Sequence, residues 1–221
     1  MPSLIYLVDD HPIMRDGIKL LLQREEDMQL CGEAVNAAEA LQALNSGVEP
    51  DLLVVDLSLP GISGLDLIKQ VRSLYPDLLI LTLSAHDESV YAERVIRAGA
   101  QGYVAKHASS NEIIAAMRKV LGGGIALSQK MHQHLVRDHF KTPKPSPVER
   151  LSDREFEVFE HIGHGKSTAD IASMMCISPK TVESHRQNIK KKINVDTSNQ
   201  LVQQAAVWVA TQGVPPPAPQ A

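Results

Sequence analysis

The chain has 221 residues, of which 43% are hydrophobic and 22% charged, and its formal net charge at pH 7 is −4. This length and composition are typical of a globular protein with a sizeable core, and they favour two domains over one. Its two cysteines, Cys31 and Cys176, are far apart and lack a metal-ligand pattern, which argues against a disulfide scaffold and a zinc finger. Asp9 and Asp10 interrupt the apolar start, and no apolar run approaches about 18 residues, so we expect no signal peptide or membrane span. The sequence therefore predicts a cytoplasmic protein.

Charge is distributed unevenly along the chain. Residues 1–140 contain 12 basic side chains against 18 acidic ones, whereas residues 141–221 contain 10 against 8. Within 180–192 there are five basic residues and one acidic residue. An acidic front half and a locally basic back half indicate two tasks, the second compatible with binding an anionic polymer.

The front half repeats one pattern, in which a short apolar run precedes a turn and a segment with helical spacing. Two runs, Leu52–Val55 and Leu78–Leu81, are apolar throughout, as in strands buried on both faces. The alternation predicts a doubly wound, five-stranded parallel sheet with helices on both faces. The predicted strands are Leu4–Val8, Gln29–Ala34, Leu52–Asp56, Leu78–Leu83 and Gly102–Ala105, and helical spacing is found at Ile13–Leu21, Ala37–Leu44, Leu65–Val71 and Ile113–Leu121.

The domain boundaries follow from composition. We expect a first domain at 1–122 and then, at 123–147, a short helix at about Gln129–His139 and a proline-rich linker. A second, helical domain is expected at 148–211. The last residues, 212–221, contain three consecutive prolines and are expected to be disordered.

The second domain is predicted to contain helices only. Ser152 begins a capping box, and Ser178 precedes Pro179 in the order typical of an N-cap and a first helical position. The predicted helices are Asp153–His164, Thr168–Met175, Ser178–Ile193 and Ser198–Thr211.

Polar residues stand at the carboxyl ends of four predicted strands. Asp9 and Asp10 end the first strand and Asp56 the third, and in a parallel sheet such ends meet at one rim. Crowded carboxylates repel one another, and a hard cation such as Mg2+ relieves the repulsion. Ser84 and Lys106 add a hydroxyl and an ammonium at the same rim. A lone aspartate there would more often cap a turn, but this set predicts a site for a transferable phosphoryl group, with a carboxylate as nucleophile.

At this point residues 1–122 resemble the receiver domain of two-component response regulators. The resemblance implies a flavodoxin-like sheet of order 2-1-3-4-5, in which Asp56 accepts a phosphoryl group from a sensor histidine kinase. It also implies that Mg2+ is held by Asp10, Asp56 and the backbone carbonyl of Ser58, with Asp9 acting through water. The strings that carry it are Val8-Asp9-Asp10-His11, Val55-Asp56-Leu57-Ser58-Leu59-Pro60-Gly61, Leu83-Ser84-Ala85 and Ala105-Lys106.

The same resemblance assigns the contacts to the phosphoryl group. Ser84 and Lys106 would bond its oxygens, and Tyr103 stands where the family has a switch aromatic that moves inward as Ser84 shifts. The alternative for Tyr103 is a half-buried sheet residue. His107 departs from the family, which often has proline there, so the cis peptide of those members stays open. Ser58 and His86, both beside the site, are candidates to tune the lifetime of the acyl phosphate.

The segment Ser178–Ile193 predicts a helix with two unlike faces. An apolar seam would face the domain core, and the opposite face would present cations and short polar side chains, which suit the major groove of DNA. Such a face is also common as a merely solvated surface. The seam is Val182, His185, Ile189 and Ile193, and the opposite face is Lys180, Ser184, Gln187 and Lys191.

A longer set of motifs favours DNA binding over a merely solvated surface, because residues 148–211 resemble the LuxR-type, or NarL/FixJ-type, DNA-binding domain. The motifs are Leu151-Ser152-x-Arg154-Glu155-x-Glu157-Val158, Gly165-Lys166-Ser167-x-Ala169-x-Ile171-Ala172 and Ile177-Ser178-x-x-Thr181-Val182-x-x-His185-x-x-x-Ile189-x-x-Lys192. The resemblance implies that the third helix reads DNA, that the fourth pairs two subunits, and that His185 is a core residue. Base contacts would come from Glu183, Ser184 and Gln187, phosphate contacts from Lys180, Thr181, Arg186 and Lys190, and subunit pairing from Leu201, Val202, Ala205 and Val209. Glu183 would either accept a hydrogen bond from cytosine or be repelled by the DNA backbone. Lys191, on the exposed face of the same helix, is also expected to contact DNA.

These features together predict a transcription regulator, not an enzyme, that is switched by phosphorylation of Asp56 in the presence of Mg2+. The expected partners are a sensor histidine kinase, double-stranded DNA with a roughly palindromic operator, and a second copy of the chain, with RNA polymerase open as a further one. A regulator of the same fold that works without phosphorylation is one alternative. An aspartate-nucleophile phosphatase is the other, disfavoured because Ser58 stands where a second catalytic acid would be and no cap insertion follows.

Overall fold

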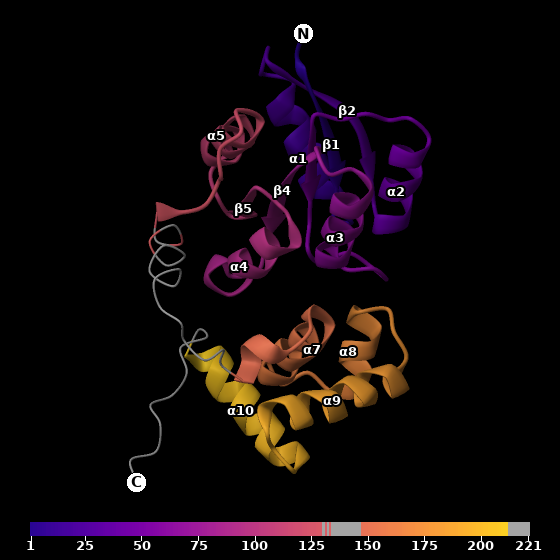
Figure 1. Ribbon diagram of the computed structural model, residues 1–221, viewed down its shortest axis with the longest axis vertical. Helices are drawn as coiled ribbons and strands as arrows, with labels where there is room; N and C mark the ends of the chain where they lie inside the picture. The colour runs from indigo at the N-terminus through magenta and orange to yellow at the C-terminus, as the bar shows by residue number, and fades with distance from the viewer. Residues whose placement is uncertain (130, 132, 134–146, 212–221) are drawn as a thin grey trace. The chain divides into compact units, whose positions relative to one another are not determined.

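The computed structural model describes residues 1–129, 131, 133 and 147–211. The chain divides into two compact units, Met1–Arg137 and Asp138–Ala221 (Figure 1). The predicted tail, most of the predicted linker and most of the short helix predicted at 129–139 lie outside the described residues. Among the helices described, none is long and apolar enough to cross a membrane.

The first unit is built on a five-stranded parallel sheet in the order β2-β1-β3-β4-β5, which confirms the predicted order. Every residue of β3 is buried, and so is every residue of β4 except the first. Helices on both faces exclude water from these central strands, which explains their uninterrupted apolar runs. The strands are β1 (Ser3–Val8), β2 (Met28–Ala34), β3 (Leu52–Val55), β4 (Leu79–Ser84) and β5 (Gly102–Ala105).

Helices cover both faces of this sheet (Figure 1). Ile18 of α1 and Met117 of α5 belong to one core cluster with Leu7 and Leu52 of the sheet, so α1 and α5 share a face. The helices α2, α3 and α4 are successive neighbours. They connect β2 to β3, β3 to β4 and β4 to β5, which runs along the sheet in the direction opposite to the step from β1 to β2. Because such crossovers are right-handed, these three helices lie on the other face. The bounds are α1 Pro12–Leu22, α2 Ala37–Asn45, α3 Gly64–Leu74, α4 Glu88–Ala98 and α5 Ser110–Leu121.

The helix α4 is the one that the sequence pattern did not single out. Its buried side chains are Tyr91, Ala92, Val95 and Ala98, a narrow stripe in which two of four members are alanines. Charged residues fill most of the remaining positions, so the helical period is weak in the sequence. Packing against α3 and β5 supplies what the local pattern lacks.

The first unit continues past the predicted boundary at residue 122. Ala126 forms a parallel bridge with Gly102 of β5, its carbonyl accepts a hydrogen bond from the Tyr103 amide at 2.8 Å, and its amide donates to the Gln101 carbonyl at 2.9 Å. A Cβ atom on Gly102 would lie 2.7 Å from the Ala126 carbonyl oxygen, so this approach requires glycine. The segment thereby covers the otherwise free edge of β5.

The described residues of the second unit form helices and no strand, and its four α-helices begin and end within one residue of their predicted bounds. The Ser152 capping box is present, and Ser178 accepts a hydrogen bond from the Thr181 amide with Pro179 in the first turn, both as predicted. Trp208 meets the Phe156 ring edge-on in the core, with 5.2 Å between ring centroids. The elements are the short 3-10 helix η1 (Pro147–Arg150), α7 (Asp153–Gly163), α8 (Thr168–Met174), α9 (Pro179–Ile193) and α10 (Ser198–Ala210).

Glu155 is a buried acid that ties α7 to α9. Its side chain is 6% exposed, and its Oε2 atom accepts hydrogen bonds from Lys192 Nζ at 2.5 Å and from the Ser152 amide at 2.7 Å. Burial raises the pKa of Glu155, but these hydrogen bonds outweigh it and hold that pKa below its usual value of 4.5. The carboxylate therefore stabilises the unit above pH 4.5, and this contribution is lost as the pH falls through the lowered pKa.

We expect Glu155→Gln to lower the free energy of unfolding of the second unit by about 2–3 kcal/mol at neutral pH, because a charged hydrogen-bond acceptor is lost. At a pH low enough to protonate this carboxyl in the folded wild type, the difference should shrink to less than about 1 kcal/mol. Trp208 is the single tryptophan, and its fluorescence during urea unfolding of the full chain reports on this unit. The exposed Asp196→Asn is the control. An equal loss at both pH values would contradict the assignment.

Candidate functional site

The predicted rim residues lie together at the carboxyl ends of the strands. Asp9 and Asp10 follow β1, Asp56 follows β3, and Lys106 follows β5. The side chains of Asp9 and Asp56 are each 1% exposed, while that of Asp10 is 37% exposed. Parallel strands bring their ends to one edge of a sheet, and this is why the ends of three separate strands converge here.

Lys106 is the cation that holds two of these carboxylates together. Its Nζ atom lies 2.7 Å from Asp9 Oδ2 and 2.7 Å from Asp56 Oδ2, and its side chain is 11% exposed. Burial lowers the pKa of Lys106, but Asp56 and Asp9 outweigh burial and raise it, so the lysine stays charged. For Asp56 the balance is reversed: burial raises its pKa, and Lys106 offsets this only in part. The buried carboxylate therefore retains affinity for further positive charge.

One oxygen of the phosphoryl-acceptor candidate has no hydrogen-bond partner within the described residues. This atom, Asp56 Oδ1, is fully buried. A buried acceptor without a partner is costly unless an ion or water satisfies it. Together with the oxygens of Asp9 and Asp10 it forms the donor set that a hard divalent cation requires, so the residues fit Mg2+. The Ser58 backbone lowers the pKa of Asp56, though less than burial raises it, and the predicted role of the Ser58 carbonyl stays a prediction.

His11 completes the cluster, and the sequence reasoning gave it no role. Its Nδ1 atom lies 2.7 Å from Asp10 Oδ1, 3.2 Å from Asp9 Oδ1 and 3.9 Å from Asp56 Oδ2. One ligand atom from each of these four residues falls within 4.8 Å of the others. In the sequence, the only feature that points to His11 as part of this site is its position, directly after two acids and before Pro12 at the start of a helix.

The switch candidates Ser84 and Tyr103 meet at His86. Ser84 is fully buried, and its Oγ atom accepts a hydrogen bond from the His86 amide at 3.2 Å. The Tyr103 hydroxyl donates to the His86 carbonyl at 2.6 Å, and burial raises the pKa of Tyr103. Tyr103 is 2% exposed, so in this structure the ring already lies inside the unit. The His86 ring packs on Tyr91 of α4 with 4.5 Å between centroids, and its Nε2 atom is 2.9 Å from Ser58 Oγ.

A further observation bears on the predictions for this unit. All peptide bonds of the described residues are trans, including the one between Lys106 and His107.

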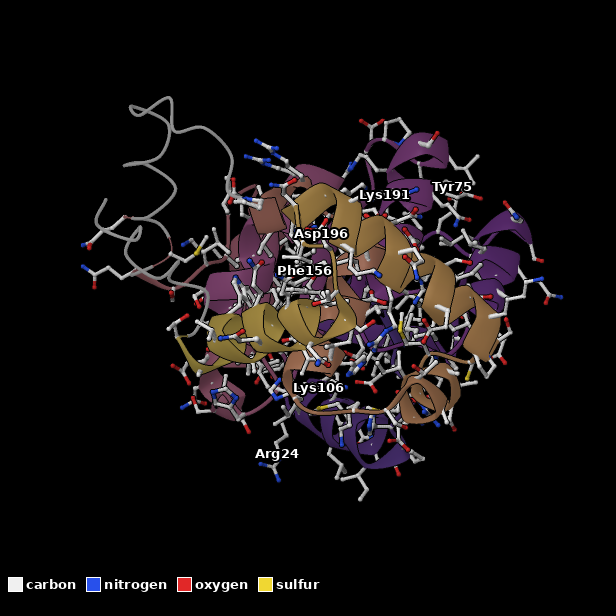
Figure 2. All side chains as sticks on the ribbon, turned by 90° about the horizontal axis from the view of Figure 1, so that it is seen from below. Arg24, Tyr75, Lys106, Phe156, Lys191 and Asp196 are labelled. Carbon is white, nitrogen blue, oxygen red and sulfur yellow. The ribbon has the colours of Figure 1, made fainter. Side chains whose placement is uncertain are left out.

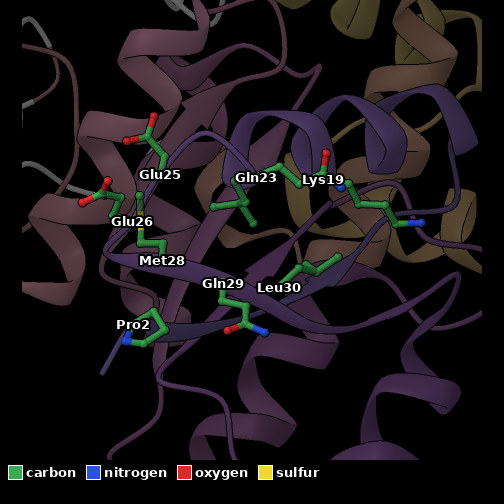
Figure 3. Close-up of a pocket in the computed structure, with 9 residues that line it drawn as sticks. Pro2, Lys19, Gln23, Glu25, Glu26, Met28, Gln29 and Leu30 are labelled. Atoms are coloured by element: carbon green, nitrogen blue, oxygen red, sulfur yellow. The ribbon is translucent and has the colours of Figure 1, made fainter.

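A cavity of about 430 Å³ lies between α1 and β2, and its lining includes Lys19 and Glu25 (Figure 3). Lys19 pairs with Glu33 at 2.8 Å and Glu25 with Arg118 at 2.5 Å, so these two lining charges already have partners. We therefore assign the cavity no function.

In the second unit, α9 has the predicted pair of faces. Val182, Ile189 and Ile193 are buried. His185 is half-buried, and burial lowers its pKa. A neutral histidine against the core fits the predicted packing role. The opposite face is exposed, with Lys191 labelled in Figure 2, and consists of Lys180, Ser184, Gln187 and Lys191.

Some predicted DNA contacts have partners inside the unit. Glu183 Oε1 accepts a hydrogen bond from Thr168 Oγ1 at 2.8 Å, which links α8 to α9, and lies 3.6 Å from Arg186 Nε. The Arg186 side chain is 13% exposed. The Thr181 hydroxyl is 2.8 Å from Ser178 Oγ at the helix start. Glu183 therefore positions α8 against α9, whichever role it has toward DNA. The half-buried Lys190 also stays a predicted contact.

The predicted pairing surface on α10 needs a correction. Leu201 and Ala205 are each 0% exposed and belong to the core of the unit, so they cannot meet a second subunit directly. Val202, at 42% exposure, and the partly exposed Val209 stay available. Val207 is 38% exposed and was not predicted. The one-dimensional pattern marked the apolar residues of α10 without showing which of them α7 covers.

Comparison with known proteins gives the same division of the chain. Residues 5–118 match the family described as response regulator receiver domain, and residues 149–205 match bacterial regulatory proteins of the luxR family. The oxygen regulatory protein NreC of Staphylococcus carnosus is 34% identical over 208 residues, which cover 91% of this chain and 95% of that protein.

Solved structures resemble the chain as well. The crystal structure of a two-component response regulator of the LuxR family from Aurantimonas sp. SI85-9A1 is 33% identical, with a TM-score of 0.58, and covers 64% of this chain and all of its own. RcsB from Salmonella enterica serovar Typhimurium, bound to the promoter rprA in the presence of the phosphomimetic BeF3-, is 22% identical with a TM-score of 0.63, covering 92% of this chain and 98% of that one. The chain therefore belongs to the two-component response regulators that join a receiver domain to a LuxR-type DNA-binding domain.

Proposed function

We propose that this regulator is switched by transfer of a phosphoryl group to Asp56 and that the switch controls its binding to DNA. The observation that carries the proposal is the state of Asp56. It is buried, held by Lys106 at 2.7 Å, and keeps a second oxygen without a hydrogen-bond partner in the described part of the chain. A carboxylate in this position can act as a nucleophile, and the Lys106 ammonium already lies where negative charge would develop during the transfer.

In the proposed transfer, an Asp56 carboxylate oxygen attacks the phosphorus of a phosphohistidine on the sensor kinase. An oxygen–phosphorus bond forms as the phosphorus–nitrogen bond breaks, and the histidine leaves. Asp9, Asp10 and Asp56, with the Ser58 carbonyl, would hold Mg2+, which supplies positive charge to the phosphoryl oxygens when bound. Lys106 is already within reach of the acceptor carboxylate, and its ammonium can turn to the new phosphoryl oxygens.

The hydrogen bonds around His86 support a route from the site to the surface. A shift of Ser84 toward the phosphoryl group would disturb its bond with the His86 amide, and the same residue's carbonyl holds the Tyr103 hydroxyl. The His86 ring also packs on Tyr91 of α4. Phosphorylation would then shift a population between two arrangements of α4 and β5, because it stabilises one more than the other.

The proposed output is DNA binding by a dimer. The exposed face of α9 presents Lys180 and Lys191 for phosphates and Ser184 and Gln187 for base edges. RcsB, which shares the fold, was solved on promoter DNA with a phosphomimetic. The predicted partners of this chain are a sensor histidine kinase in the cytoplasm, a roughly palindromic operator and a second copy of the chain, paired in part through Val202 and Val209.

The proposal is tested by fluorescence anisotropy of labelled DNA, selected from genomic fragments by binding to this protein, at a stated salt concentration. The titration is made with and without Mg2+ and a small phosphodonor. We expect tighter, cooperative binding when both are present. Equal binding under all conditions would contradict the switch and favour a regulator of the same fold that works without phosphorylation. Turnover of a small phosphoester far beyond one equivalent would instead indicate a phosphatase.

A further inference from the structure

We propose that His11 is a ligand of the metal at the rim site and that its nitrogen raises the affinity of the site for Mn2+ more than its affinity for Mg2+. This inference rests on the proposed function, because it concerns the same cation site. It adds a fourth side chain to the acidic set and a nitrogen donor that an all-oxygen site lacks.

The first argument is the position of the imidazole nitrogen. The Nδ1 atom lies 2.7 Å from Asp10 Oδ1 and 3.2 Å from Asp9 Oδ1, and Asp56 Oδ2 is 3.9 Å away. At metal–ligand distances of about 2.0–2.2 Å, neighbouring ligand atoms around one ion stand about 3 Å apart. The nitrogen is thus spaced from the Asp9 and Asp10 oxygens as neighbouring ligands are on a shared ion, and Asp56 Oδ2 lies farther away.

The second argument is that the backbone holds His11 in place. Its amide donates to Asp9 Oδ1 at 2.9 Å, and its φ and ψ of −85° and 111° are extended. Pro12 follows, and a residue before proline is restricted to that region. His11 occupies the N-cap position of α1, yet its side chain makes no capping hydrogen bond. The ring is directed to the carboxylates instead.

Pairing of a histidine with acids does not account for the whole arrangement. One nitrogen carries at most one proton, so Nδ1 cannot donate a full hydrogen bond to both Asp9 and Asp10. The buried Asp56 Oδ1 atom has no hydrogen-bond partner among the described residues even with His11 present. A cation shared by the nitrogen and the carboxylates would satisfy these atoms together.

The larger gain for Mn2+ follows from ligand chemistry. Mg2+ is a hard cation that selects oxygen ligands and gives up its water reluctantly. Imidazole nitrogen favours first-row transition metals, and Mn2+ is the member of that series that also accepts a carboxylate-rich site. Replacing one oxygen or water by His11 therefore raises the affinity for Mn2+ more than that for Mg2+.

The test measures metal binding by the full chain. Mn2+ binding is followed by electron paramagnetic resonance, with pulsed detection of a directly bound 14N nucleus, and Mg2+ binding by competition against Mn2+. We expect a 14N signal in the wild type. His11→Ala should lose that signal and at least about tenfold in Mn2+ affinity, since even partners outside the coordination shell contribute about that much. Its Mg2+ affinity should change by less than about threefold.

Two further variants sharpen the comparison. His164→Ala removes an exposed histidine from the second unit and should change neither affinity. His11→Asn keeps a polar side chain that can offer oxygen, and should retain Mg2+ binding without the 14N signal. Because His11 is 62% exposed, neither change at that position removes core packing.

The outcomes separate this inference from the proposed function. If the wild type binds both metals without a 14N signal, or if His11→Ala weakens both equally, His11 is not a ligand, and the inference is overturned while the switch stands. Asp56→Asn should weaken both metals in any case. If the wild type binds neither metal, the Mg2+ requirement of the proposed function fails together with the inference.

Discussion

Replacing Asp56 with asparagine is expected to abolish the response to a phosphodonor and to leave the weaker, donor-independent binding of DNA. The variant keeps the size of the side chain but removes the nucleophilic carboxylate and one of the two carboxylate partners of Lys106. Intact-mass measurement should show one added phosphoryl group on the wild type and none on the variant. Anisotropy titrations with and without the donor should coincide for the variant.

The matched control is Asp77→Asn, which makes the same carboxylate-to-amide change at an exposed acid of the same unit. It should accept a phosphoryl group and, like the wild type, bind DNA with higher affinity in the presence of the donor. Donor-dependent tightening that persists in Asp56→Asn would refute Asp56 as the acceptor. Loss of the response in Asp77→Asn as well would show that the effect of either change is not specific to the rim.

The second large effect is expected at the exposed face of α9. Gln187→Ala should weaken binding to the selected operator by about 1–3 kcal/mol and relax discrimination at one base pair, because an amide that bonds a base edge is lost. Lys191→Ala should weaken binding to all DNA sequences alike. It should also reduce the slope of log affinity against log salt concentration by about one unit, as expected for a phosphate contact. Both variants should still accept a phosphoryl group at Asp56.

Asn188→Ala serves as the control on the same helix, because Asn188 is exposed but lies outside the predicted contact set. It should bind the operator like the wild type. The measurement is a titration of operator and scrambled DNA at several salt concentrations. If Asn188→Ala weakens operator binding as much as Gln187→Ala does, α9 presents a different face to DNA.

The sequence by itself determined the strand pattern and the rim. The runs at β3 and β4 are apolar throughout because both faces of those strands are buried, so burial is written directly into residue type. Asp9, Asp56 and Lys106 could be placed together because parallel strands end at a common edge. The caps at Ser152 and Ser178 were equally readable, since capping depends on residues within one turn.

Tertiary structure alone decided the features that depend on contacts between distant segments. The pattern on α10 shows apolar residues but not that Leu201 and Ala205 face α7 while Val202 faces solvent. The helix α4 has too narrow a stripe to be recognised before α3 and β5 pack on it. The covering of β5 by Ala126 and the approach of His11 Nδ1 to three carboxylates are set by backbone geometry and loop direction. Local sequence encodes what each segment prefers, whereas these placements follow only when the segments share one core.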